Sequence, residues 1–466
     1  MVLYPAAAAF VLIWLLLSFR NVENGLVMTN AVGPFGMFAA GNLGGPSIIL
    51  ANLLAMLTIG VLILRYFSVQ QHALAPQVPK AAIYLFLFAA YSLFSGFILV
   101  RLFQGQFLVF PMTVTSKGTM VSAFFSSTMV PLRPSNSNIS QPFYILLSAM
   151  LFWASFVILR RRGPELAERG LVWAATINIL LGLMDLFKLD AVLQFVRTAD
   201  YNLNNEHMVA GVQRIIGGFS EAAGFGALSS ALFAYFAVSF LMQNRSRDAL
   251  LAVGSLICAL LALSSTAILS LAMACFLILV HGPVLLKTNI SRQFAHFLVI
   301  AIAILICAAC LMLLMPQSNG LTARVLDTLI FSKGTSLSGL ERAAWAQGGL
   351  DVFFETWGLG AGAGSVRSNG LFSVLLGNVG LPGTLAFAMF LFHTIARPLP
   401  ACDVDLSRVF YAGRISALTF FASLLVSATG PDPTLILMVF TCLSIVAREI
   451  AFAQTPDFDF QRQLQP

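Results

Sequence analysis

Apolar runs of about 20 residues recur along the whole sequence. A helix of about 20 apolar residues crosses the hydrocarbon core of a bilayer. An open sheet cannot cross it, because its edge N–H and C=O groups would remain unpaired in lipid. The runs also lack the alternation of apolar and polar residues that marks a transmembrane β-barrel. Charged residues make up 10% of the chain, against about 25% in soluble globular proteins. The sequence therefore predicts an all-α, polytopic membrane protein.

Twelve such runs predict about twelve membrane-spanning helices in a single domain, 1–466. A break at 264–266 is compatible either with a loop between two spans or with a kink in one long helix. The expected spans are 4–19, 47–66, 81–101, 141–160, 171–187, 219–242, 249–264, 266–282, 297–315, 371–395, 409–428 and 433–448.

The distribution of Lys and Arg predicts the orientation of these spans. With both termini in the cytoplasm, every compact basic cluster falls on the inner side, including the triple arginine at 160–162, as the positive-inside rule requires. The long intervals then lie outside. They are 20–46, 102–140, 188–218 and 316–370, and the last, between the ninth and tenth spans, is the largest.

Several kinds of chemistry find no support in the sequence. The six cysteines lie in or beside apolar runs, so no disulfide framework is expected. Cys307 and Cys310 form a CxxC spacing within a span, which favours a buried structural pair. The sequence has no HExxH motif and no cluster of His, Cys and Asp, so neither a metal nor another cofactor is expected. The glycines of 358–364 follow no strand, which argues against a nucleotide-binding fold and for close packing against a ligand or a helix.

The first candidate site is the segment RIIGGFSE, 214–221, at the start of the sixth span. Arg214 precedes the span, and Glu221 is expected about one turn inside it. A charge placed in a membrane span is costly and is a functional candidate by default. Arg214 would then bind a phosphate group, and Glu221 would act as a base or orient Arg214. The alternative is an interfacial arginine beside a paired or snorkelling glutamate.

The second candidate is 338–383, which we expect to form a partly ordered platform at the membrane face. It contains Arg342 and Trp345, the glycines of 358–364, and Arg367 followed by Ser and Asn369. Guanidinium groups bind phosphates bidentately and stay charged at any working pH. Arg342 and Arg367 are therefore predicted to hold a diphosphate. The alternative is a salt bridge to Glu341, Asp351 or Glu355, or an interfacial anchor.

Other polar residues are weaker candidates. His207 in an outer loop is expected to be a solvated side chain rather than a catalytic one. His281 and His393 lie at inner ends of spans, away from any outer site. Asp185 and Lys188, three residues apart, are expected to pair with each other.

With these motifs in place, the chain resembles the O-antigen ligase and O-antigen polymerase superfamily of bacterial envelope glycosyltransferases. The resemblance rests on the span count, the large late outer loop and three motifs, and it covers 205–390 best. The motifs are RIIGGFSE, then ERAAW followed by WGLGAGAG, then SNGLFSVLLGNVGLPG. It implies a GT-C-like bundle in the bacterial inner membrane and a metal-independent reaction at its periplasmic face. The donor would be a polyprenyl-diphosphate-linked oligosaccharide, with Arg214 and Arg342 at the phosphate-binding positions.

The chain departs from the family pattern at two positions. The family's Ser-Arg-Gly-like patch before a later span is Ser264-Ser265-Thr266 here, without the Arg. Ligases carry a His in the closing motif, where this chain has Asn369. An amide cannot act as a general base, so Glu221 or another carboxylate must take the proton, or the site relies on positioning alone. We therefore expect Glu221, Asn369 and Arg342 at the catalytic centre and Arg214, Arg342 and Arg367 around the diphosphate.

These expectations favour a repeat-unit polymerase that joins lipid-linked oligosaccharides. The alternatives are a ligase that transfers a finished glycan to a lipid or protein, and a flippase for lipid-linked glycans. The expected partners are the polyprenyl-diphosphate-linked oligosaccharide, membrane lipids and a chain-length regulator protein, but no nucleic acid.

Overall fold

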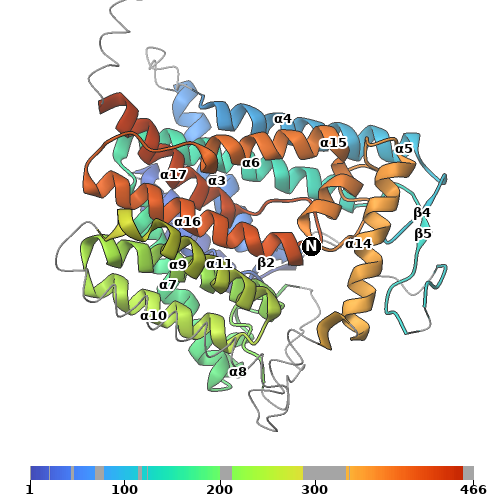
Figure 1. Ribbon diagram of the computed structural model, residues 1–466, viewed down its shortest axis with the longest axis horizontal. Helices are drawn as coiled ribbons and strands as arrows, with labels where there is room; N and C mark the ends of the chain where they lie inside the picture. Colours follow the sequence, from blue (N-terminus) through green and yellow to red (C-terminus); the bar gives the residue numbers. More distant parts are fainter. Residues whose placement is uncertain are drawn as a thin grey trace, which may run out of the picture.

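The computed structural model describes residues 2–19, 21–42, 47–68, 78–113, 118–122, 124–199, 213–286, 332–334 and 336–454, and the chain over these ranges is mostly helical (Figure 1). The longer helices are α1 (Pro5–Ser18), α3 (Leu50–Ser68), α4 (Lys80–Phe94), α6 (Ser137–Arg162), α7 (Glu165–Leu186), α9 (Ala222–Gln243), α10 (Ser246–Leu261), α11 (Ser265–Leu285), α14 (Leu337–Glu355), α15 (Leu371–Leu391), α16 (Val404–Ser427) and α17 (Leu435–Gln454).

Shorter elements connect these helices. They are α2 (Val22–Ala31), α5 (Val100–Leu102), α8 (Asp190–Leu193), a three-stranded antiparallel sheet of β1 (Val2–Leu3), β2 (Ala39–Asn42) and β3 (Ser47–Ile49), and the pair β4 (Leu108–Val109) and β5 (Val130–Pro131). These short strands were not expected from the sequence.

Eight helices in the described ranges are long and apolar enough to cross a membrane. They are α4 with its continuation to Leu102, α6, α7, α9, α11, α15 with its continuation to Ala396, α16 and α17. Helix α1 and the apolar part of α3 are shorter, and α10 has 16 residues. Eleven of the expected spans thus coincide with helices, while the ninth, 297–315, lies outside the described residues. The structure does not establish a count of twelve spans.

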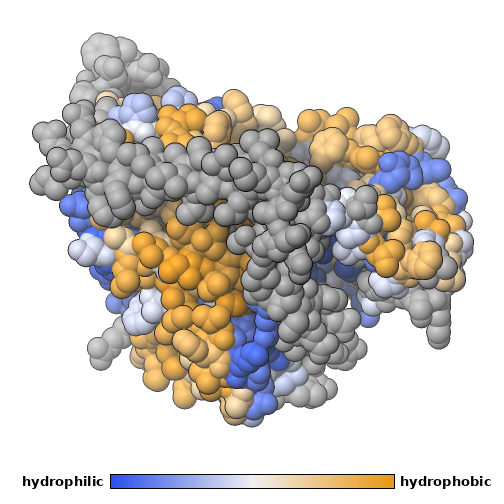
Figure 2. Space-filling view, turned by 60° about the horizontal axis from the view of Figure 1, so that its bottom comes forward, coloured by the Kyte–Doolittle hydropathy of each residue, from blue (hydrophilic) through white to orange (hydrophobic). Residues whose placement is uncertain are grey.

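The exposed surface of these helices is rich in large apolar side chains. Leu16 is 70% exposed, Leu250 72% and Phe276 58%, and Figure 2 shows apolar side chains gathered in patches on one face, beside a hydrophilic strip. Apolar patches of this extent mark surfaces that contact lipid or another protein. The surface therefore agrees with a membrane protein.

Helix α9 lies at the centre of the bundle. It is rich in Ala, Gly and Ser, residues that allow neighbouring helices to approach closely, and its apolar window is buried throughout. Its C-terminus is marked by Asn244 in the left-handed conformation, a common helix stop. Helices α10, α11 and α16 pack against it. The core is thus built around one helix with no lipid-facing side within the described residues.

The break near residue 264 is a chain reversal and not a kink. Helix α10 ends at Leu261 and α11 begins at Ser265. A Cβ on Gly226, in the first turns of α9, would lie 3.1 Å from Ala262 and 2.5 Å from Ala267. At the other end of α11, the His281 ring lies 5.6 Å from the ring of Tyr411 in α16. Both α10 and α11 therefore run along α9, in opposite directions.

The bundle has two ends that recur below. The α14 end carries α14, the segment 213–221 before α9, and the segment 356–370 between α14 and α15. The Arg408 end carries the last turns of α6, α9 and α11 and the first turns of α7, α10 and α16. In Figure 1, α14 and the β4–β5 pair stand together at one side of the bundle.

Candidate functional site

The structure brings together the arginines that the sequence singled out at the α14 end. Arg214 precedes α9, Arg342 lies on α14, and Arg367 follows the glycine segment. The charges of Arg342 and Glu221 both act on Arg214, and those of Glu221, Glu341 and Arg342 act on Arg367. Three cations from separate segments therefore share one electrostatic environment with Glu221.

Arg214 is held by its backbone neighbours. Ile215 donates its N–H to the carbonyl of Leu261 at 3.3 Å, and Arg214 Nε donates to the carbonyl of Ala262 at 3.5 Å. Burial lowers the pKa of Arg214, Arg342 lowers it further, and Glu221 raises it. No described carboxylate forms an ion pair with Arg214.

A buried ion pair supports this segment. Asp185 accepts hydrogen bonds from the N–H groups of Ile216 at 2.7 Å and Gly217 at 3.0 Å. It forms an ion pair with Arg197 at 2.9 Å, and Arg197 also donates to the carbonyl of Gly217 at 2.7 Å. The expected pairing of Asp185 with Lys188 is wrong, because Asp185 is used to hold the turn before α9.

Glu221 occupies a different place from the one expected. Helix α9 begins at Ala222, so Glu221 is its N-cap residue and does not lie one turn inside. Its backbone is extended, with φ −138° and ψ 146°, and its side chain makes no capping hydrogen bond. The carboxylate therefore stands at the helix entrance, with its charge acting on Arg214 and Arg367.

Arg342 lies in the second turn of α14. This helix falls within 316–370, which was expected from the sequence to be a loop between two spans. The side chain of Ser336 caps the helix by accepting the Gly339 N–H at 3.1 Å. The expected alternative was a salt bridge from Arg342 to a nearby acid, but none of the described ion pairs contains Arg342. Two of those acids have other partners within the described residues.

Glu341 accepts hydrogen bonds from Ser126 Oγ at 2.9 Å and from Ser127 Oγ at 2.6 Å, and Asp351 accepts one from Gln347 at 2.7 Å. Ser127 also accepts the indole N–H of Trp345 at 2.8 Å. These bonds tie α14 to the 118–131 segment and leave Arg342 without a carboxylate partner among the described residues.

Arg367 is the most firmly placed of the three arginines. Its guanidinium carbon lies 4.4 Å from the ring centroid of Trp345, within the range of a cation–π contact. Nη1 donates to the carbonyl of Met112 at 3.2 Å, and Nε is buried without a partner among the described residues. Burial is the main cause of the lowered pKa of Arg367. The side chain is thus fixed in place while part of its donor capacity remains unused.

The glycine segment supports Arg367 through close packing. Gly360, Gly362 and Gly364 have φ of +80°, +105° and +86°, a region that only glycine enters at no steric cost. A Cβ on any of them would lie 2.2–2.5 Å from the backbone of a neighbouring helix. Asn378 of α15 closes the turn by accepting the N–H groups of Gly364 at 3.0 Å and Val366 at 3.2 Å. Of the two expected roles, the structure shows packing against helices.

Asn369 lies just before α15 and links the start of α15 to the end of α16. Its Nδ2 donates to the carbonyl of Val426 at 3.2 Å, and the next residue, Gly370, donates its N–H to the carbonyl of Ala428 at 2.8 Å. The side-chain amide is therefore used as a positioning group in this structure.

One acidic residue near this site was missed. Asp432 lies between two prolines in the connection from α16 to α17, and it was not among the expected site residues. Its Oδ1 accepts hydrogen bonds from Ser148 Oγ at 3.0 Å and from the Thr434 N–H at 3.3 Å. Burial raises the pKa of Asp432 to about 6, against the two hydrogen bonds, which lower it.

The connection that holds Asp432 adjoins the segment 356–370, which holds Arg367. Val426 and Ala428 accept the bonds from Asn369 and Gly370 described above. A Cβ on Gly430 would lie 3.2 Å from the side chain of Met112, the residue whose carbonyl accepts from Arg367. The only sequence signal for Asp432 is an acid placed between two spans on the outer side.

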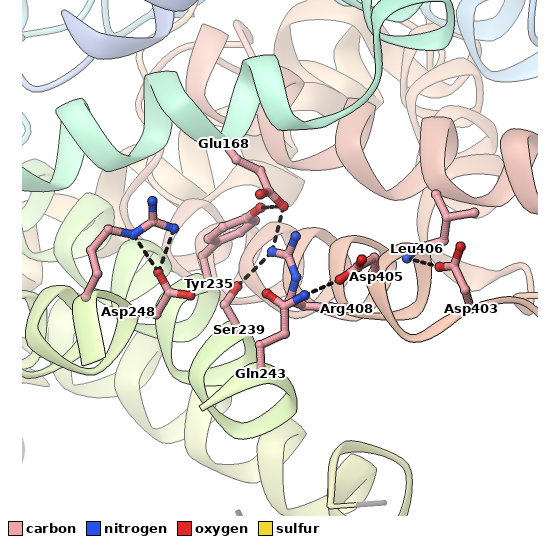
Figure 3. A network of polar contacts seen from close by, with 10 residues as sticks. Glu168, Tyr235, Ser239, Gln243, Asp248, Asp403, Asp405, Leu406 and Arg408 are labelled. Carbon is pink, nitrogen blue, oxygen red and sulfur yellow. Dashed lines mark hydrogen bonds and ion pairs between the residues drawn. The ribbon is translucent and has the colours of Figure 1, made fainter. Parts of the chain in front are cut away.

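Buried charges at the Arg408 end are arranged differently (Figure 3). Arg408 forms an ion pair with Glu168 at 2.6 Å, and Tyr235 donates to the same carboxylate at 3.0 Å. Arg408 also donates to Ser239 Oγ at 3.4 Å. Nearby, the side chain of Gln243 donates to Asp405. Arg408 is 4% exposed and lies within α16, which begins at Val404, so the expected start of this span at 409 is wrong.

The remaining candidates lie elsewhere. His281 and His393 are far from the α14 end, as expected, while His207, Cys307 and Cys310 are outside the described residues. The four described cysteines are free. In the described part of the chain, no group of three or more His, Cys, Asp or Glu residues is placed to hold a metal ion.

Comparison with known proteins adds no name to this geometry. No protein-family model matches the chain, and no curated protein matches it significantly.

Proposed function

We propose that the protein is a bacterial envelope polysaccharide polymerase, a metal-independent glycosyltransferase that uses a polyprenyl-diphosphate-linked oligosaccharide as donor. One observation carries this proposal: Arg214, Arg342 and Arg367 converge at the α14 end, and no described carboxylate pairs with any of them. Cations without an ion pair to any described carboxylate in a partly buried site favour an anionic ligand, and guanidinium forks suit phosphate oxygens.

In the proposed reaction, a sugar hydroxyl of the acceptor attacks the anomeric carbon of the donor. The bond from that carbon to the diphosphate oxygen breaks, and the polyprenyl diphosphate leaves with the electron pair. Negative charge develops on the leaving oxygen, and fixed cations stabilise it more in the transition state than in the ground state. Arg367 is already held by Trp345 and Met112, so little reorganisation is needed when charge develops.

The hydroxyl proton needs an acceptor, and two carboxylates are candidates. The charge of Glu221 acts on both Arg214 and Arg367. Asp432 accepts hydrogen bonds through Oδ1 and has a pKa of about 6, which suits proton transfer near neutral pH. Asn369 would only position the acceptor, because an amide does not take up a proton at this pH.

The favoured location is the bacterial inner membrane, with the α14 end facing the periplasm. The family's His is replaced by Asn369, which favours a polymerase over a ligase. A flippase would need unpaired charges along a path through the bundle. The buried charges Arg408 and Glu168 at the opposite end are instead paired with each other.

Separate variants Arg214→Gln, Arg342→Gln and Arg367→Gln test this proposal. Each should reduce polymer synthesis in cells by about 30–100-fold, because a charge-assisted bond in a transition state contributes about 2–3 kcal/mol. Arg161→Gln, an exposed arginine at the opposite end, is the matched control and should make normal polymer. Normal polymer in all three site variants, at normal protein levels, would refute the assignment.

The lipid-linked product that accumulates without the protein separates the alternatives. Single repeat units on the carrier support a polymerase, whereas long chains on the carrier support a ligase. Units trapped at the cytoplasmic face would support a flippase.

A further inference from the structure

A polar cleft lies at the Arg408 end of the bundle, away from the proposed active site. It has a volume of about 510 Å³. A smaller cavity of about 230 Å³ shares Glu165 and Arg169 with it. We call the two together the α7 cleft. Its lining residues include Asn21, Glu23, Asn24, Arg162, Glu165, Arg169, Trp173, Arg245 and Arg247.

The α7 cleft offers charges of both signs. Arg162 forms an ion pair with Glu23 through Oε1 at 2.9 Å, while Glu23 Oε2 is buried with no hydrogen-bond partner among the described residues. Leaving a buried carboxylate oxygen unsatisfied is costly. Arg169 is exposed and forms no ion pair with any described residue. A ligand with an N–H cation at one point and an anion at another would satisfy both groups.

The surroundings of the cleft are apolar and lie at helix ends. Helix α1 ends at Ser18, α6 ends at Arg162 and α7 begins at Glu165. Asn24, on the cleft wall, donates to the carbonyl of Leu17 in α1 at 3.3 Å. Nearby Leu16 is 70% exposed and Phe19 87%, and Trp173 on α7 is 58% exposed. Tryptophan concentrates at the membrane–water interface, so the cleft opens at the level of lipid headgroups.

We propose that the α7 cleft binds the headgroup of an amine-bearing zwitterionic glycerophospholipid. The phosphate would lie against Arg169, and the primary ammonium would donate to Glu23 Oε2 and Glu165. The acyl chains would follow the exposed apolar surfaces of α1 and α7. This site does not depend on the proposed polymerase activity.

The charges select among headgroups. A choline headgroup has a quaternary ammonium with no N–H to donate, so it leaves Glu23 Oε2 unsatisfied. An anionic glycerol headgroup provides no cation for Glu23 and Glu165. A soluble zwitterion lacks the chains that the apolar border would cover.

The test is lipid retention by the purified full-length protein. Phosphatidylethanolamine, phosphatidylcholine and phosphatidylglycerol with identical acyl chains are supplied in equal amounts, and the bound lipid is counted by native mass spectrometry. We expect phosphatidylethanolamine to be retained at least about 5-fold over each of the others. Equal retention of the three lipids by the unmodified protein, or a preference for phosphatidylglycerol, would overturn the proposal.

Variants locate the site. Glu23→Gln and Arg169→Gln should each lower phosphatidylethanolamine retention about 5-fold, and Glu165→Gln is a further variant if either fails to fold. Arg161→Gln lies in the same basic triplet but does not line the cleft, and it should retain the lipid as before. Unchanged headgroup preference in well-folded Glu23→Gln and Glu165→Gln would place the lipid elsewhere and refute the assignment.

Discussion

The arginines withdrawn from solvent are partnered differently at the two ends of the bundle. At the Arg408 end, Arg408 is buried against Glu168 at 2.6 Å and Arg247 lies against Asp248 at 2.9 Å. At the α14 end, Arg214, Arg342 and Arg367 converge without an ion pair among the described residues. A buried charge with a built-in partner stabilises the arrangement of helices, whereas converging charges without partners are arranged for a ligand.

The α14 end also contains its own counter-example. Arg197 lies near the candidate site yet is paired with Asp185 and bonded to the Gly217 carbonyl. Position at this end is therefore not what distinguishes the three arginines. They differ from Arg197 in having no carboxylate in an ion pair with them among the described residues.

The largest expected effect is on folding at the Arg408 end. Arg408→Ala leaves Glu168 buried without its partner, which should destabilise the protein by about 3–5 kcal/mol. Thermal unfolding of the detergent-purified protein measures this loss. The exposed Arg161→Ala is the control. An unchanged unfolding temperature for Arg408→Ala would show that this pair is not structural and would remove one side of the comparison.

The next effect is on activity at the α14 end. Arg367→Lys keeps the charge but loses the planar fork and its stacking on Trp345, so transfer should fall about 10–100-fold. The unfolding temperature should fall by far less than in Arg408→Ala. Transfer is measured with a lipid-linked oligosaccharide in detergent. A variant that loses stability and activity together would place Arg367 with the structural arginines.

Asp432 predicts a dependence on pH. A base must be deprotonated to act, so if Asp432 takes the proton, transfer should fall about tenfold per pH unit below about pH 6. Asp432→Asn should be inactive. The comparison variant Glu221→Gln should still show the fall in transfer rate below about pH 6. An active Asp432→Asn enzyme would exclude Asp432 as the base and leave the arginine site standing.

The same pKa shift predicts the sign of a stability effect. The folded-state pKa of Asp432 is raised, so its contribution to stability is present when it is protonated and is lost as the pH rises through about 6. Asp432→Asn removes this dependence. Above pH 7 the variant should unfold at the same temperature as the parent protein or at a higher one. A lower unfolding temperature there would contradict the burial that raises the pKa.

The smallest expected effect comes from Ser148. Its hydroxyl donates to Asp432 Oδ1 and lowers the pKa of that carboxyl. Ser148→Ala should therefore move the acidic limb of the transfer profile to higher pH, by about half a unit to one unit, as one neutral hydrogen bond contributes about 1 kcal/mol. The neighbouring Ser155→Ala is the control. If the pH dependence of transfer in Ser148→Ala matched that of the parent protein, the hydrogen bond from Ser148 would have no part in the reaction.

The sequence predicted the helices well because their apolar runs are long, but it misplaced ends where charge is buried. The expected start of α16 at 409 excluded Arg408, since a lone arginine looks solvated until its partner Glu168 is known. That partner lies 240 residues earlier in the chain. Likewise, Asp185 pairs with Arg197, and spacing along one helix turn could not reveal it.

The candidate site was predictable in part. Arg214, Arg342 and Arg367 were found because charges beside apolar runs are conspicuous, and the structure brings them together. Helix α14 was not resolved from its loop, since glycines and charged residues interrupt its apolar residues. Asp432 was missed because an acid between prolines looks like an ordinary turn, and its burial comes from α6, which only the fold brings near.

Diphosphate binding tests the central claim most directly. The probe is farnesyl diphosphate, a short polyprenyl diphosphate, titrated into the purified protein by calorimetry beside farnesyl monophosphate. The unmodified protein should bind the diphosphate at least about tenfold more tightly than the monophosphate, a difference of about 1.4 kcal/mol. The triple variant Arg214→Gln, Arg342→Gln, Arg367→Gln should lose this binding. A folded triple variant that binds the diphosphate as tightly as the parent protein would contradict the account.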